Sequence, residues 1–176
     1  MSTKFKNVLP ITHKHLCYLY FYFFILSILS LLIALYAILL SYDNTSIPYI
    51  NIALMGSSAC GVLGCSLNYI RKLYKTQLSD HFKYLSPHDE DFHKSMATVF
   101  YFISRPIFSI AFVLLFILGF KTGLLSISNG TNELNNTFCD ITMFFSLFIG
   151  FATGAFLKLV QHRATEIVES TLSNTK

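Results

Sequence analysis

Four long stretches with almost no charge constrain the fold of this chain more than any other feature. They cover residues 16–42, 48–70, about 101–120 and about 138–157. Each holds roughly 18 or more mostly apolar residues, the length that a helix needs to cross the hydrocarbon core of a bilayer. Charged residues make up 12% of the sequence, against about a quarter in a soluble domain. The sequence therefore predicts an all-α polytopic membrane protein, with four transmembrane helices in a single domain over residues 1–176.

The lysines and arginines predict which side each loop occupies. Of the 13 such residues, all except Arg105 and Lys121 belong to the two ends of the chain or to the loop over residues 71–96. Because an excess of Lys and Arg marks the cytoplasmic side, both termini and this loop are expected in the cytoplasm, most naturally beside a bacterial inner membrane. The net charge of +4 then faces anionic lipid of the inner leaflet. The basic residues form no cluster that suits nucleic acid, so none is expected as a partner.

The loop over residues 71–96 is expected to form two helical pieces. Apolar residues recur at spacings of three and four from Ile70 to Leu85, which favours a continuation of the second span as an amphipathic helix on the membrane surface. Ser86 and Pro87, followed by acidic residues, are typical of a helix start. A new helix is therefore expected there, leading into the third span.

Groups that could perform chemistry are scarce within the expected spans. No Asp or Glu lies in the core of a span, and Asp140 stands at the outer edge of the fourth. A proton-coupled exporter needs such a carboxylate, and an intramembrane serine protease needs a base at depth, so both classes are disfavoured. No histidine lies within a span to hold haem. We therefore expect a non-enzymatic protein without a cofactor.

The string HDEDFHK, residues 88–94, is the part of the sequence that most resembles a metal site. Asp89 and His93 stand one helical turn apart and could both face an ion. Acidic residues in the first turn of a helix also complement the helix dipole without any ligand. This second interpretation is favoured, and no metal is expected.

Four cysteines are too few and too scattered for a disulfide framework. They are Cys17, Cys60, Cys65 and Cys139, and only the last is expected near the outer face, so no intrachain disulfide is predicted. A single outer thiol could link two copies of the chain. A buried free thiol is the commoner role and is favoured here.

Arg105 is the one cation within an apolar stretch, in FISRPIF, residues 102–108. Pro106 to Phe120 provides about 22 Å of helix, which places Arg105 near the inner boundary of the membrane. One interpretation is an anchor that snorkels to headgroups where a proline-kinked helix begins. The other is a cationic ring at the inner mouth of an oligomeric pore. Lys158, after the fourth span, is a second candidate for pore or headgroup contact.

Small residues give the second and fourth spans surfaces suited to close packing. The stretch GSSACGVLGC, residues 56–65, and the stretch from Gly150 to Gly154 carry them. Helices in a bilayer associate through small residues that let backbones approach. Packing within one bundle explains such faces. The small-residue face of the second span is, however, wider than one partner helix needs, so an interface between copies of the chain remains an alternative. The candidate residues are Gly56, Ser57, Cys60, Gly61, Gly64, Gly150 and Gly154.

Three segments resemble a loose class of uncharacterised small four-span bacterial inner-membrane proteins, some of them found beside anti-phage defence systems. The segments are GVLGCSLNYIRKLY, YFISRPIFSIAFVLLFILGFKTGLL and FIGFATGAFLKL. Members of this class have no agreed activity, so the resemblance implies a fold and leaves the function open.

Three functional hypotheses follow from these features. The first is a self-associating inner-membrane protein that acts as a small channel or a membrane-perturbing accessory. The second is a membrane anchor that recruits a cytoplasmic protein through the loop over residues 71–96. The third is a small-solute transporter, which would have to bind its substrate with uncharged polar residues of the second span: Asn51, Ser57, Ser58 and Asn68.

Overall fold

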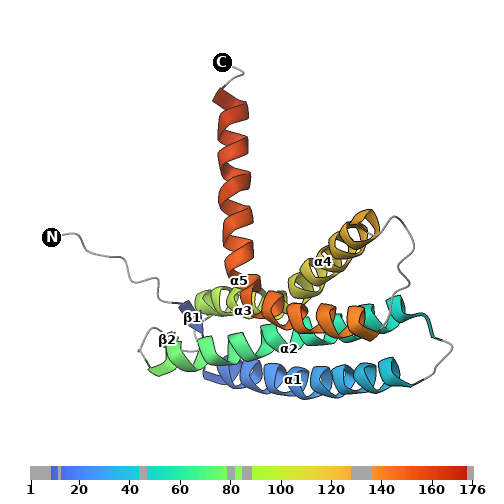
Figure 1. Cartoon of the computed structure of the whole chain (residues 1–176). Coiled ribbons are helices and arrows are strands. Elements are labelled where there is room, and N and C mark those ends of the chain that lie inside the picture. The colour runs from blue at the N-terminus through green and yellow to red at the C-terminus, as the bar shows by residue number, and fades with distance from the viewer. Residues whose placement is uncertain are drawn as a thin grey trace.

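Helices make up nearly all of the fold. The structure is a computed structural model that describes residues 9–11, 13–43, 47–78, 82–84, 89–127 and 136–173. The helices in these segments are α1 (His13–Tyr42), α2 (Tyr49–Leu78), α3 (Asp89–Ile103), α4 (Arg105–Ile127) and α5 (Asn136–Ser173). In Figure 1, α1, α2 and the first part of α5 lie side by side, and α4, which runs at an angle to them, contacts both α2 and α5.

Four helical segments are long and apolar enough to cross a membrane, as the sequence predicted. They are Lys14–Tyr42, Tyr49–Lys75, Met96–Gly123 and Asn136–Val160. The third combines the end of α3 with most of α4. The prediction of four helices that are long and apolar enough to cross a membrane is thereby confirmed, whereas the side of the membrane on which the termini lie stays a prediction.

Pro106 explains why the third segment is broken into α3 and α4. A proline has no N–H to donate, and its ring clashes with the carbonyl four residues earlier, here that of Phe102. The backbone N–H of Ser104 donates to the carbonyl of Phe100 at 3.0 Å, and that of Phe108 donates to the carbonyl of Ser104 at 3.3 Å. The chain therefore resumes its helix after a single turn residue, and Arg105 becomes the first residue of α4.

Two buried clusters mark the two ends of the helical bundle. The first, which we call the Arg105 end, contains Leu16, Leu19, Phe23, Cys65, Tyr69, Leu73 and Phe102. The second, the Asp140 end, contains Ala37, Ile52, Ala53, Val113, Ile117, Phe138, Cys139 and Met143. The beginning of α1 thus meets the end of α2, and the end of α1 meets the beginning of α2. This alternation of direction is what successive membrane crossings require.

The loop between α2 and α3 differs from the sequence-based expectation. The second span continues as a helix past residue 70, as expected, because α2 extends to Leu78. The expected continuation as far as Leu85 is wrong, because β2 (Phe82–Tyr84) follows. β2 pairs in parallel with β1 (Leu9–Ile11), with Leu9 opposite Phe82. Two aromatic residues flank one lysine in β2, an alternation that suits a strand. The all-α class therefore holds apart from this short two-stranded pair.

The expected helix start at Ser86 and Pro87 lies outside the described residues. The helix itself is present, and its first described residue is Asp89.

Candidate functional site

The small residues of α2 and α5 face each other inside one chain. A methyl group added to Gly150 would collide with the backbone of Gly61, and one added to Gly64 would collide with the backbone carbonyl of Leu147. The two helices therefore touch backbone to backbone, as small residues allow in a bilayer. The surfaces of these glycines are therefore already in contact with other helices of the same chain.

The other candidate residues of this face also lie against neighbouring helices. A methyl group on Gly56 would come within 2.9 Å of Ala37 Cβ in α1, and one on Gly154 within 3.0 Å of the Tyr69 hydroxyl in α2. Ser57 is fully buried, and Cys60 is partly buried.

Side-chain hydrogen bonds join α2 to two other helices. Asn68 Nδ2 donates to the carbonyl of Phe151 in α5 at 2.6 Å, and Ser109 Oγ of α4 donates to the carbonyl of Gly61 at 2.9 Å. Such bonds satisfy polar groups that lipid cannot. The first bond holds α5 against α2, and the second holds the start of α4 against α2.

The polar residues proposed for a transporter do not form one site. Asn51 is exposed, Ser57 Oγ is buried, and Asn68 is engaged with α5. Asn51 and Asn68 are separated by about 25 Å of helix, and Ser58 lines an apolar pocket. The described structure therefore gives the transporter hypothesis no shared binding surface.

A second pair of glycines, on α4, has open space around it. A methyl group added to Gly119 or Gly123 would find no described atom within 4 Å. These residues have the same four-residue spacing as the packed pair on α5. The pair is not among the residues predicted for close packing, because the predicted third span ends at Phe120, ahead of Lys121, and divides the pattern GFKTG.

Arg105 is folded into the bundle. Its side chain is 8% exposed, and Cζ lies 3.9 Å from the centre of the Tyr101 ring. Within the described part of the chain, its Nε is buried without a hydrogen-bond partner. A cation in this position is costly unless something pairs with it. The two interpretations of Arg105, an anchor for lipid headgroups and a pore residue, both stay predictions.

Two lysines lie at the same end of the bundle as Arg105. Lys72 Nζ is 4.7 Å from the centre of the Tyr69 ring, and Lys72 interacts electrostatically with both Arg105 and Lys158. The three cations come from α2, α4 and α5. We call Lys72, Arg105 and Lys158 the cation cluster.

Aromatic rings hold the cation cluster in place. Tyr69 stacks on Phe23 at 5.7 Å between ring centres and meets the edge of Phe102 at 5.8 Å. Phe102 in turn meets Tyr101 at 5.5 Å. Rings at these distances attract each other, and their faces attract cations.

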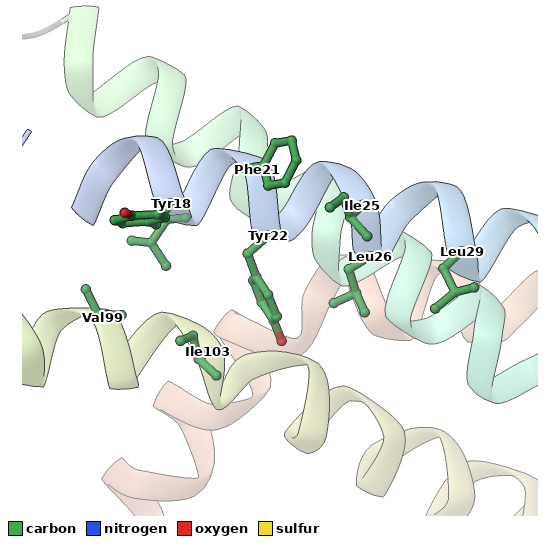
Figure 2. Close-up of a pocket in the computed structure, with 9 residues that line it drawn as sticks. Tyr18, Phe21, Tyr22, Ile25, Leu26, Leu29, Val99 and Ile103 are labelled. Atoms are coloured by element: carbon green, nitrogen blue, oxygen red, sulfur yellow. The ribbon is translucent and has the colours of Figure 1, made fainter. Parts of the chain in front are cut away.

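Two apolar grooves flank the helices near the cation cluster. Figure 2 shows the first, between α1 and α3, where Tyr22 reaches from α1 toward the break between α3 and α4. Its volume is about 420 Å³. The second groove, of about 440 Å³, lies between α4 and α5 and is lined by Phe112, Phe116, Phe145, Phe148, Ile149, Ala152 and Phe156. Grooves of this character suit hydrocarbon.

The metal and thiol candidates contribute no site among the described residues. No group of three His, Cys, Asp or Glu side chains is close enough there to share a metal ion. The side chains of residues 88–94, with Asp89 and His93, lie outside the described part. Cys139 is buried, and its Sγ donates to the carbonyl of Tyr49 at 3.4 Å, so this thiol is enclosed by its own chain.

No family model matches the chain, and no curated protein or solved structure matches it either. Its function is therefore inferred from its own residues and contacts.

Proposed function

We propose that this chain is a non-enzymatic integral membrane protein of the bacterial inner membrane that self-associates through α4 and acts as a membrane-perturbing accessory. Acting as a small channel is the alternative activity for the same self-associated protein. The open Gly119 and Gly123 pair on α4 is the observation that supports self-association.

The proposal moves the interface between copies away from α2 and α5. Gly61, Gly64 and Gly150 are already packed within the chain, so they have no surface left for a second copy. On α4, Leu115 and Leu118 are exposed beside the open glycines. A facing helix could approach the glycine backbone while these leucines supply the surrounding van der Waals contacts.

The position of Arg105 favours the accessory role over a channel with a charged mouth. Its side chain is buried within its own chain, whereas Gly119, further along α4, has open space around it. Copies that meet through the α4 glycines would therefore bring Gly119, and not Arg105, to the interface between them.

The mass of the purified protein in lipid nanodiscs tests self-association. We expect wild type to contain at least two copies, and the double variant Gly119→Ile with Gly123→Ile to contain one, since isoleucine keeps backbones apart. Ala155→Ile is the matched control, because Ala155 is an exposed small residue on α5. It should behave as wild type. A wild type with a single copy would contradict the proposal.

A membrane anchor for a cytoplasmic protein is the second candidate, and the length of α5 favours it. This helix continues to Ser173, beyond the end of its membrane-crossing segment at Val160, which adds about 20 Å. Figure 1 shows its last part pointing away from the other helices. A helix in that position offers a surface to a partner. A wild type with one copy in the nanodisc experiment would favour this role.

A further inference from the structure

We propose that the cation cluster binds the phosphate of an anionic phospholipid whose acyl chain lies in the groove between α4 and α5. The site would take one lipid from the leaflet at the Arg105 end. The inference goes beyond self-association, because the open α4 glycines lie toward the other end of the helix.

The unpaired guanidinium is the first observation. The exposed fraction of the Arg105 side chain is only 8%, and its Nε has no hydrogen-bond partner in the described structure. Tyr101 covers one face of the guanidinium but cannot accept the in-plane hydrogen bond of Nε. A phosphate oxygen can, and charge-assisted bonds between Arg and phosphate are among the stronger hydrogen bonds.

The balance of charge is the second observation. Lys72 and Lys158 add two ammonium groups at this end, and both side chains are exposed. The phosphate of an anionic lipid would complement these three positive charges.

The position of the groove is the third observation. Phe112 and Phe116 follow Arg105 by seven and eleven residues on α4, so all three share one face of the helix. Both phenylalanines line the groove, and across it Phe148 and Phe156 of α5 are exposed to the surroundings. The groove is therefore open to lipid.

Length decides that the occupant is a lipid. Arg105 to Phe116 spans about 16 Å along α4, and one leaflet contributes about 15 Å of hydrocarbon. A phosphate at Arg105 thus places its acyl chain alongside the ring of Phe116. A free phosphate would leave the groove unfilled.

A single introduced tryptophan can report on this groove, because the chain contains no Trp. We would place it by Phe148→Trp and measure its quenching by phosphatidylglycerol or phosphatidylcholine with brominated acyl chains, in mixed vesicles. The expected preference for phosphatidylglycerol is about tenfold, as one charge-assisted hydrogen bond supplies. Leu32→Trp on the exposed face of α1 reports the general lipid shell and should show no preference.

Arg105→Gln in the Phe148→Trp protein should abolish the preference. Arg71→Gln is the matched control, since it removes an exposed cation at the same end, and it should retain the preference. If Arg105→Gln does not fold, Lys158→Gln decides: a reduced preference supports the proposal, and an unchanged one overturns it.

Three results would overturn the proposal. The first is equal quenching by the two lipids in the Phe148→Trp protein, and the second is a preference that survives Arg105→Gln. The third is a preference that excess inorganic phosphate removes, which would assign the cation cluster to free phosphate instead of lipid. The monomeric variant Gly119→Ile with Gly123→Ile should keep the lipid preference, so failure of self-association and failure of lipid binding are distinguishable.

Discussion

Single residues decide how closely the helices of this chain approach each other. At Gly150 the backbone of α5 touches that of α2 at Gly61, whereas on α4 the space beside Gly119 is open. The two glycines look alike in sequence, since each begins a pair with four-residue spacing. Their surroundings give them opposite roles, one inside the bundle and one on its outer surface.

This contrast predicts opposite effects of the same substitution. Gly150→Ala should lower the free energy of unfolding in detergent by about 1–3 kcal/mol, because the added methyl group must push two backbones apart. Gly119→Ala should leave stability unchanged or raise it by up to about 1 kcal/mol, since alanine is the better helix former. Thermal unfolding of the two variants provides the comparison. Equal loss of stability in both would show that α2 and α5 do not meet at Gly150.

At the scale of helices, the break between α3 and α4 sets the position of Arg105. Pro106 interrupts the backbone hydrogen bonds, Ser104 forms the turn, and α4 restarts at Arg105, whose side chain is buried. The Tyr101 ring then lies over the guanidinium. One proline thus brings a cation and its aromatic partner to the end of the membrane-crossing segment.

Removing the proline should straighten this junction. In Pro106→Ala the hydrogen bond to the carbonyl of Phe102 can form, and α3 should continue into α4 as one helix. Spin labels at the exposed positions Met96 and Leu115 should then move apart, as measured by pulsed electron paramagnetic resonance. An unchanged distance would mean that tertiary contacts, and not Pro106, impose the break.

Physical reasons decide which of these features can be predicted from the sequence. The four spans are predictable because lipid demands long apolar helices. The pairing of Leu9 with Phe82 is not, because it depends on a contact between distant short segments. The burial of Arg105 cannot be predicted from the sequence either, because it depends on how α2, α4 and α5 pack together. Gly123 lies outside the predicted third span because the charge of Lys121 interrupts the apolar stretch.

At the scale of the whole molecule, the chain is a bundle with distinct ends. The Arg105 end combines buried aromatic rings with the cation cluster, and the Asp140 end combines a mixed apolar cluster with an aspartate that accepts from Tyr42 Oη at 2.8 Å. Lys and Arg favour the cytoplasmic side, so we predict that the Arg105 end faces the cytoplasm.

Labelling of single cysteines from either side of the membrane tests the four-span account most directly. The four native cysteines would be replaced, and one cysteine introduced by Lys83→Cys or Asn129→Cys in sealed inverted and right-side-out vesicles. The account predicts that an impermeant maleimide labels position 83 only from the cytoplasmic side and position 129 only from the opposite side. Labelling of both positions from the same side would contradict it.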